Sequence, residues 1–325
     1  MISLKQITSP ILDDIDIFKT EFKEALNSEV KLINSISGYL LKNRGKTIRP
    51  IMTILCARLC GNPTKNTYKA AVMMELLHVA TLIHDDIVDD AKIRRGKPSI
   101  KHIWKNKISV LMGDFILSKA LINMVGLKDF DALDLISRTA EKLSAGEIMQ
   151  IEKSLTRNMP KNVYYDMINQ KTASLIAASC ELGAITTTKV STDRKSTFDY
   201  GENLGMAFQI KDDLFDFLGS ENQTGKDHGG DVKKNMLTLP LIYSIENASR
   251  TGRNRIKSLV RKKKKSAKIL KEINDIIYDS GGFDYAKKKL DEFSDKATDS
   301  ISSYAESEIK KSLINLVVFN KERVG

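Results

Sequence analysis

The segment that decides the fold runs from residue 68 to residue 90 and reads YKAAVMMELLHVATLIHDDIVDD. From Tyr68 to Asp89 it is apolar on nearly every side, which predicts one long helix buried in the middle of the protein. The helix ends in a D-D-x-x-D motif formed by Asp85, Asp86 and Asp89. Residues four apart share a helix face, so Asp85 and Asp89 project together. The sequence therefore places paired carboxylates at the end of a buried central helix.

A second D-D-x-x-D motif, formed by Asp212, Asp213 and Asp216, lies far along the chain. Like charges at this spacing destabilise a bare helix by roughly a few tenths of a kcal/mol, so positive charge should offset the repulsion at both places. Clustered carboxylates suit hard divalent cations, and Mg²⁺ held by one or two carboxylates usually also binds substrate phosphates. Two such clusters facing each other predict a clamp for a polyphosphate.

Composition and periodicity favour an all-α protein. The 325 residues are 42% hydrophobic and 29% charged, which is ample for a core, and the 18 glycines and 6 prolines are too few for a typical all-β chain. No Pro/Gly-rich linker divides the chain, so we expect one domain over residues 1–325. Helical spacing predicts helices over 11–41, 50–60, 68–89, 110–125, 131–155, 163–187, 192–218, 239–248, 257–280, 283–303 and 306–319.

The formal net charge of +11 and the pI of about 9.3 suit an anionic partner, such as phosphate, nucleic acid or an anionic membrane surface. Much of the excess lies between Arg250 and Lys271, with five consecutive cations at 261–265. This stretch lacks the interleaved aromatic residues of nucleic-acid sites, so we expect no nucleic-acid partner. A solvated helix face or loop is the simpler interpretation.

The three cysteines, Cys56, Cys60 and Cys180, form no zinc-ligand pattern and predict buried thiols in a reduced, cytoplasmic protein. The beginning of the sequence lacks the apolar core of a signal peptide. No run reaches the ~18 apolar residues needed to span a membrane. We therefore expect no membrane span, although the protein may still handle apolar molecules in its interior.

Three basic segments could bind phosphate. Gly45-Lys46-Thr47-Ile48-Arg49-Pro50 stands at a helix start, where free N–H groups add to the cationic side chains. Arg94-Arg95-Gly96 follows the first motif; its arginines either bind two phosphates or simply neutralise the aspartates. Lys171 lies inside an apolar helix and needs an anionic partner there. A later loop, 224–231, adds Lys226.

His78 lies two turns before Asp85, so it could reach a substrate but hardly the same metal; the alternative is a hydrogen-bonded core histidine. No Ser/His/Asp, Cys/His or H-E-x-x-H set occurs, which argues against acyl transfer and zinc proteolysis. Metal ligands, diphosphate ligands and a deep apolar interior together indicate ionisation of a phosphorylated, lipid-like substrate.

From about Asn43 to Pro240 the chain resembles the trans-polyprenyl diphosphate synthases. The motifs occur in the family's order: Gly-Lys-x-x-Arg-Pro at 45–50, Glu-Leu-Leu-His at 75–78, the first D-D-x-x-D, Arg-Arg-Gly at 94–96, Gly-Asp-Phe at 113–115, Lys-Thr at 171–172, Gln209 before the second D-D-x-x-D, and Thr-Leu-Pro at 238–240. The resemblance implies an orthogonal helical bundle around a central apolar cavity, the isoprenoid synthase fold, and a homodimer.

The resemblance also implies roles for individual residues. Three Mg²⁺ ions would be held by carboxylates of both motifs: Asp85, Asp89 and Asp212, supported by Asp86, Asp213 and Asp216. The diphosphate of an allylic substrate would be bound by the cations Arg94, Lys171 and Lys226. Isopentenyl diphosphate would be bound by Lys46, Arg49, His78 and Arg95. Thr172 and Gln209 would line the reacting centre, where their dipoles stabilise an allylic cation.

The implied reaction is ionisation of the allylic diphosphate, attack by the double bond of isopentenyl diphosphate, and loss of a proton to the departing diphosphate. One departure from the family lies at Asn235-Met236, where relatives usually have Gly-Lys. A lysine that contacts diphosphate is therefore missing, unless Lys233 or Lys234 replaces it. If neither lysine replaces it, we expect weaker binding of the diphosphate near residues 235–236.

Product length is predicted from the residues one turn below the first motif, Ala80 and Thr81. Short-chain members of the family often have a bulky aromatic residue there, whereas these side chains are small. Leu77, Met74 and Met73 lie deeper, where methionine adapts to a flexible chain or simply fills the core. We expect a product longer than farnesyl, of the kind used for quinone side chains, with residues 116–124 as the opposite wall.

Four alternatives stay open. The enzyme could be a geranylgeranyl or farnesyl diphosphate synthase. A non-catalytic partner subunit should have lost carboxylates or arginines, which this chain keeps. A basic, helical nucleic-acid-binding protein is suggested by charge alone. A terpene cyclase shares the metal sites but has no need of the second cation set, Lys46, Arg49 and Arg95.

Overall fold

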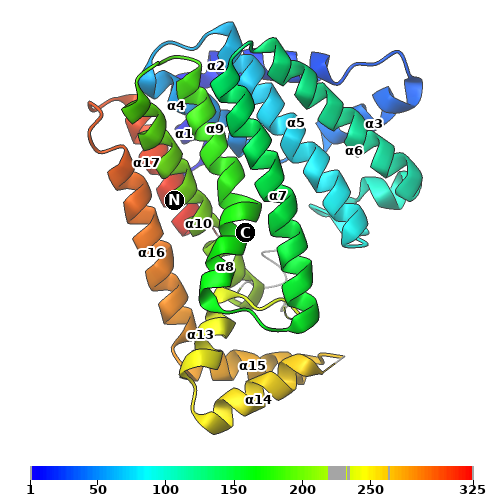
Figure 1. Ribbon diagram of the computed structural model, residues 1–325, viewed down its shortest axis with the longest axis vertical. Helices are drawn as coiled ribbons and strands as arrows, with labels where there is room; N and C mark the ends of the chain where they lie inside the picture. Colours follow the sequence, from blue (N-terminus) through cyan, green and yellow to red (C-terminus); the bar gives the residue numbers. More distant parts are fainter. Residues whose placement is uncertain (1, 219–231, 233–234, 263, 324–325) are drawn as a thin grey trace.

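The computed structural model describes residues 2–218, 232, 235–262 and 264–323, and it is built almost entirely of helices (Figure 1). The helical elements are α1 (Leu4–Thr8), η1 (Ser9–Ile11), α2 (Leu12–Ala25), α3 (Lys31–Lys42), α4 (Ile48–Cys60), α5 (Lys65–Val88), α6 (Ile100–Gly126), α7 (Phe130–Thr156), α8 (Lys161–Ile168), η2 (Asn169–Ala173), α9 (Ser174–Ile185), α10 (Ser191–Leu218), α13 (Leu239–Asn247), α14 (Arg250–Arg261), α15 (Ala267–Asp279), α16 (Gly282–Ser300) and α17 (Glu308–Glu322). The all-α prediction is confirmed.

The helix predicted over 68–89 is α5, which begins three residues earlier because Thr64 and Thr67 form a reciprocal cap. It is enclosed by α2, α4, α6 and α9, so its apolar side chains are buried around most of its circumference. Burial on all sides is what its nearly uniform apolar sequence requires. Asp89 caps its end, with its N–H 2.8 Å from the Asp85 carbonyl oxygen.

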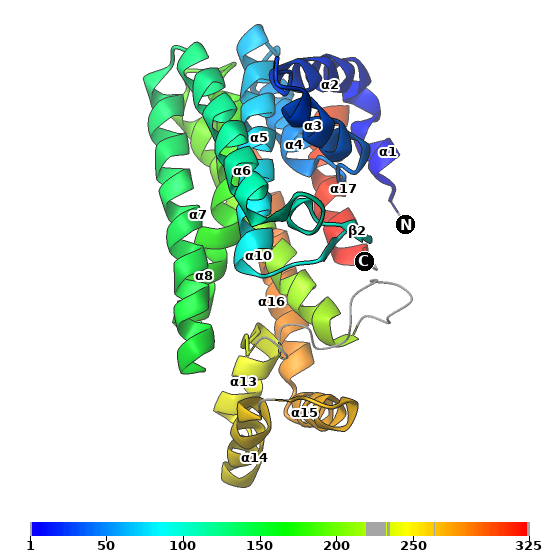
Figure 2. The same cartoon turned by 90° about the vertical axis from the view of Figure 1, so that its right-hand side faces the viewer.

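Two apolar cores lie along the bundle. One gathers around α4, α5, α6 and α9, and the other around α8, α13, α14 and α15. The long helices α10 and α16 contribute to both, and Figures 1 and 2 show α13, α14 and α15 as a smaller group at one end. The extent of a single domain over 1–325 stays a prediction.

Three predicted helices are interrupted. The stretch 11–41 breaks between α2 and α3, where the Asn34 side chain bonds to both the N–H and the carbonyl oxygen of Ser28 (3.0 and 2.6 Å). The stretch 257–280 breaks between α14 and α15 at the run of like charges. The stretch 163–187 contains the π-helical turn η2, which carries Lys171 and Thr172. Such turns often occur at functional sites.

The segment between α5 and α6 contains a small hairpin, β1 (Ile93–Arg94) and β2 (Lys97–Pro98), paired antiparallel. The Tyr39 hydroxyl of α3 donates to the Pro98 carbonyl oxygen at 2.7 Å and holds the hairpin beside the end of α5. The loop predicted over 224–231 lies outside the described residues.

Within the described residues, α6 alone is long and apolar enough by length and composition to cross a membrane. One third of its most apolar window is buried, and its inner side packs on α5. A core helix of a soluble protein meets the same criterion, so the expectation of no membrane span is not contradicted.

Candidate active site

The first aspartate cluster, Asp85, Asp86 and Asp89, stands at the end of α5 beside the hairpin. Asp86 is buried, and Arg94 donates to its Oδ1 through Nε and Nη2, both at 2.7 Å. Burial raises the pKa of Asp86, and Arg94 opposes that rise. The arginine predicted either to bind phosphate or to neutralise aspartate is therefore seen here as a counter-ion of the cluster.

Asp85 faces α7. Burial, followed by the nearby Glu147 carboxylate, raises the pKa of Asp85 to about 6, while Lys171 and Arg94 act in the opposite direction. A carboxylate whose ionised form is disfavoured by burial and by a second carboxylate is stabilised when a cation approaches. This observation agrees with a divalent cation at Asp85.

Lys171, which is half-buried, has the anionic partner that its place in an apolar helix led us to expect. Its Nζ lies 2.5 Å from Glu147 Oε2 and 3.0 Å from Gln150 Oε1. A Cβ at Gly146 would lie 2.7 Å from the Lys171 backbone nitrogen, so only glycine allows α7 this close to η2. Sequence reasoning missed Glu147 and Gln150. Their signal was the pattern Gly-Glu-x-x-Gln on a predicted helix, because residues three apart share a face.

The second aspartate cluster, Asp212, Asp213 and Asp216, lies near the end of α10. Asp213 is buried and accepts hydrogen bonds from the Tyr164 hydroxyl at 2.6 Å, from Gln209 Nε2 at 3.1 Å and from the Leu239 N–H at 3.2 Å. Each donor comes from a different element or turn, so this carboxylate ties α8, α10 and α13 together. Asp213 therefore has a structural role, and its metal role stays a prediction.

Gln209 and Thr172, which the resemblance assigns to the reacting centre, contact each other. The Thr172 hydroxyl donates to Gln209 Oε1 at 2.8 Å, and the amide nitrogen of Gln209 donates to Asp213. The chain of hydrogen bonds fixes the orientation of the amide. Asp212, in contrast, pairs with Arg323, whose Nη2 lies 2.6 Å from its Oδ1.

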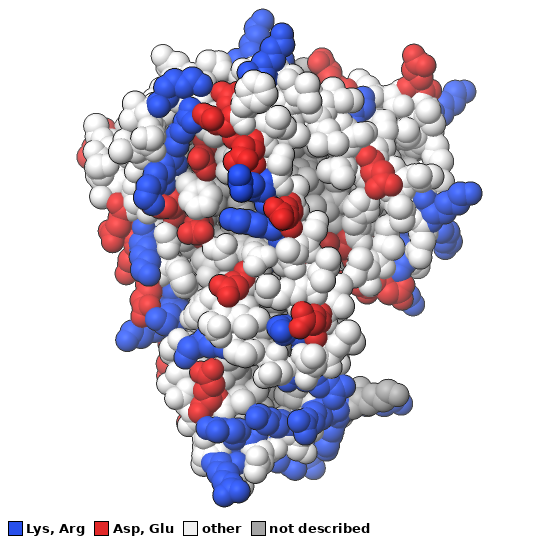
Figure 3. Space-filling model, in the orientation of Figure 1, with Lys and Arg blue, Asp and Glu red and all other residues white. Residues whose placement is uncertain are grey.

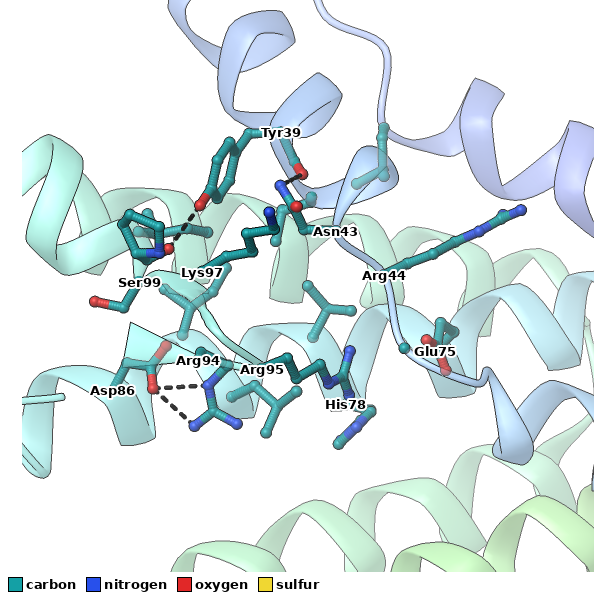
Figure 4. A pocket seen from close by; sticks show the side chains of 18 of the residues that line it. Tyr39, Asn43, Arg44, Glu75, His78, Asp86, Arg94, Arg95, Lys97 and Ser99 are labelled. Atoms are coloured by element: carbon teal, nitrogen blue, oxygen red, sulfur yellow. Dashed lines mark hydrogen bonds and ion pairs between the residues drawn. The ribbon is translucent and has the colours of Figure 1, made fainter. Parts of the chain in front are cut away.

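A cationic pocket adjoins the first cluster, and its lining includes Arg44, Arg94 and Arg95 together with the apolar Leu40 and Val79 (Figure 4). The figure shows Arg95 beside His78, with Glu75 close by. A Cβ at Gly45 would fall on the Arg95 guanidinium, at 2.4 Å, so the glycine makes room for this cation. The mixed lining suits a small molecule with an anionic head and an apolar body.

The predicted isopentenyl diphosphate ligands are only partly brought together. Arg49 and Arg95 both lower the pKa of His78, after burial, to well below its usual value, so His78 is neutral. Burial lowers the pKa of Arg49 to about 10, and its Nε has no hydrogen-bond partner among the described residues. An unsatisfied buried donor beside a second arginine suits an anionic ligand. Lys46 instead lies over the Phe319 ring of α17, 5.3 Å from its centroid.

The remaining predicted residues divide into three groups. Ala80, Leu77 and Met74 are buried in the core on α5, and the Thr81 hydroxyl donates to the His78 carbonyl oxygen at 2.9 Å. Ile116, Ala120 and Met124 of α6 are buried in the same core. Lys226, Lys233 and Lys234 lie outside the described residues.

The basic run gains one contact near the departure from the family. Lys265 Nζ donates to Asn235 Oδ1 at 2.9 Å, next to Met236. Most other cations of the run are exposed, and Figure 3 shows Lys and Arg gathered over α14 and α15. This agrees with a solvated face.

Among the described residues, no three His, Cys, Asp or Glu side chains converge as a ready metal site. Protein cations instead stand against the acids: Arg94 on Asp86, Lys171 on Glu147 and Arg323 on Asp212. Carboxylate oxygens are the hard ligands that Mg²⁺ prefers, so the carboxylates of the two clusters fit this ion.

Comparisons with known proteins show which family the chain belongs to. The polyprenyl synthetase family matches residues 30–277. Heptaprenyl diphosphate synthase component 2 from Geobacillus stearothermophilus is 36% identical over 75% of this chain and 76% of its own length. All-trans-nonaprenyl-diphosphate synthase from Rhodobacter capsulatus is 32% identical over 99% of both chains.

Among solved structures, a polyprenyl synthase from Caulobacter crescentus CB15, complexed with calcium and isoprenyl diphosphate, aligns with a TM-score of 0.92. It is 30% identical and covers 99% of this chain and 98% of its own. The family match spans most of the sequence and includes both aspartate clusters, Arg94, Arg95 and Lys171. The chain therefore belongs to the trans-polyprenyl diphosphate synthase family and is a prenyltransferase.

Proposed function

We propose that the protein is a Mg²⁺-dependent synthase that condenses isopentenyl diphosphate with an allylic diphosphate to make a long-chain all-trans polyprenyl diphosphate, of the kind used for quinone side chains. The observation that carries this is the pairing of two sites at the end of α5. Carboxylates with their own counter-ions lie on one side, and the pocket of Arg95 and His78 lies on the other.

The first site would take the allylic substrate. Asp85, Asp89 and Asp212 would hold Mg²⁺, because their carboxylates are the hard ligands that this ion prefers. The bound ions would neutralise charge on the leaving diphosphate. Arg94 and Lys171 would bind the same diphosphate, together with Lys226, which lies outside the described residues. Both described cations already stand beside carboxylates, so each exchanges one anion for another when substrate binds.

The second site would hold isopentenyl diphosphate. Arg49 and Arg95 would contact its diphosphate, and the neutral His78 would donate or accept a hydrogen bond without adding charge. Thr172 and Gln209 would present their dipoles to the allylic cation. The proton would leave with the diphosphate. The buried apolar side chains of α5, Ala80, Leu77 and Met74, would help to keep water from the cation.

Support for a long product comes from the small, buried Ala80 and from the relatives, whose names specify heptaprenyl and nonaprenyl products. A geranylgeranyl or farnesyl diphosphate synthase is the alternative. Incubation with an allylic diphosphate, isopentenyl diphosphate and Mg²⁺, followed by sizing of the products, tests both. Products no longer than geranylgeranyl would reject the long-chain proposal, and lack of any Mg²⁺-dependent condensation would reject the reaction.

We also infer a homodimer through α6 and α7, which lie on the same side of the bundle (Figure 2). Large apolar side chains there are unusually exposed, for example Val125 at 70% and Phe130 at 86%. Apolar patches of this kind mark interaction surfaces. Light scattering coupled to size-exclusion chromatography measures the mass directly, and a strictly monomeric active enzyme would contradict the inference. The cytoplasmic location stays a prediction.

A further inference from the structure

Arg323, which follows α17, has its guanidinium fixed on the second aspartate cluster. Nη2 lies 2.6 Å from Asp212 Oδ1 and 3.0 Å from the Phe208 carbonyl oxygen, and Nε donates to Asn320 Oδ1 at 3.0 Å. The guanidinium carbon stands 4.1 Å from the centroid of the Phe208 ring. Only 12% of the side chain is exposed. The contact is therefore a built site for one cation, rather than a loose surface pair.

A second cation stands beside it. Lys211 Nζ donates to the Lys321 carbonyl oxygen at 2.7 Å and joins α10 to the end of α17. Burial, followed by Arg323, lowers the pKa of Lys211. Two neighbouring cations repel each other, and Asp212, which pairs with Arg323, supplies negative charge on the same helix as Lys211.

Asp212 is also the residue of this cluster that the proposed function assigns to Mg²⁺. A guanidinium bonded to a carboxylate oxygen and a divalent cation on the same oxygen exclude each other by charge and by space. We propose that Arg323 is the resting counter-ion of Asp212, that it leaves this carboxylate when a divalent cation binds, and that it lowers the metal affinity of the second cluster. This inference rests on the proposed metal role of Asp212.

The consequence is a link between the end of α17 and metal occupancy. The guanidinium must move, and the contacts of Arg323 with Phe208 and Asn320 are broken or rearranged with it. Lys46 lies over Phe319 of the same helix, which places a residue of the predicted isopentenyl diphosphate set within reach of that movement.

The test is a titration of the protein with Mn²⁺ alone, followed through the electron paramagnetic resonance signal of free Mn²⁺. All variants carry Asp85→Asn and Asp89→Asn, which leaves the second cluster as the metal site. Arg323→Gln should bind Mn²⁺ about fivefold more tightly, the effect of removing a competitor worth about 1 kcal/mol. Lys321→Gln is the matched control, since it removes one positive charge from the same helix, where Lys321 pairs with Asp291.

Unchanged or weaker Mn²⁺ binding in Arg323→Gln overturns the inference, as does equal tightening in Lys321→Gln. Arg323→Lys provides a second variant that keeps the charge but loses the planar fork and the stacking on Phe208. Its Mn²⁺ affinity should fall between those of the protein with Arg323 and of Arg323→Gln. Asp212→Asn separates the two hypotheses. If it weakens Mn²⁺ binding while Arg323→Gln has no effect, only the role of Arg323 is refuted. If it leaves Mn²⁺ binding unchanged, the metal role of Asp212 is refuted as well.

Discussion

At the first aspartate cluster, the second aspartate of the motif pairs with an arginine from a neighbouring hairpin. At the second cluster, the first aspartate pairs with an arginine that lies more than a hundred residues further along the chain. Asp86 pairs with Arg94, whose side chain is partly exposed, whereas the corresponding Asp213 is enclosed by three donors from α8, α10 and α13. Corresponding aspartates of the two identical motifs thus have different hydrogen-bond and ion-pair partners. The position of an aspartate within D-D-x-x-D does not by itself assign its role.

The largest expected effect is on turnover. Asp85→Ala and Asp212→Ala should each reduce condensation by roughly a thousandfold or more, because each removes a proposed metal ligand while the fold stays intact. Steady-state assays with isopentenyl diphosphate, together with circular dichroism as the control for folding, measure this. Near-normal rates in either variant would remove that cluster from the clamp.

Stability should separate Asp213 from Asp86. Asp213→Asn leaves at least one buried donor facing another donor, so we expect the free energy of unfolding to fall by about 3 kcal/mol. Asp86→Asn loses one pair with a partly exposed arginine and should cost about 1 kcal/mol. Urea unfolding of both variants gives the comparison. Equal losses would mean that the two positions are structurally equivalent after all.

Product length should depend on the residues beneath one cluster only. Ala80 lies five residues before Asp85, and Phe208 lies four residues before Asp212, where its ring stacks on Arg323. Ala80→Phe should shorten the product by one or more isoprene units, since the ring fills the small space under the first cluster. Phe208→Ala is the matched control and should leave the length unchanged. Chromatographic sizing that shows the same products for Ala80→Phe and the parent would place the tunnel elsewhere.

The smallest effect concerns pH and the pocket beside the first cluster. Burial, followed by Arg49, Arg95 and Arg94, holds the pKa of His78 well below its usual value, whereas in the unfolded chain it is about 6.5. Below pH 6.5 the unfolded state therefore binds more protons, so His78 makes stability fall as pH decreases, by at most about 1.4 kcal/mol per pH unit. Denaturation of His78→Asn should show a shallower loss between pH 6.5 and 5 than the parent. Parallel curves there would show that His78 titrates normally, and curves between pH 7 and 8 serve as the internal control.

Much of the site was predictable from residue type and spacing. Asp85 and Lys171 needed only helical periodicity and the rule that a charge inside an apolar helix requires a partner, whereas Gln209 was assigned by the resemblance to the family alone. The identity of that partner was not predictable, because Glu147 and Gln150 reach Lys171 only through the close crossing of α7 at Gly146. The predicted helices over 11–41, 163–187 and 257–280 were too long, since apolar spacing alone does not register a side-chain cap at Ser28, a π-helical turn at 169–173 or repulsion within a basic run.

The sequence by itself determined the helical class, the buried central helix α5 and the two carboxylate clusters, because these depend on local period and composition. Only the tertiary structure decided which cation stands on each carboxylate. Asp212 and Arg323 are brought together by the packing of α17 on α10, and Asp213 acquires its donors from helices that are distant in sequence. Such pairings depend on the distance between packed helices. The spacing of residues along the chain does not encode the distance between side chains in different helices.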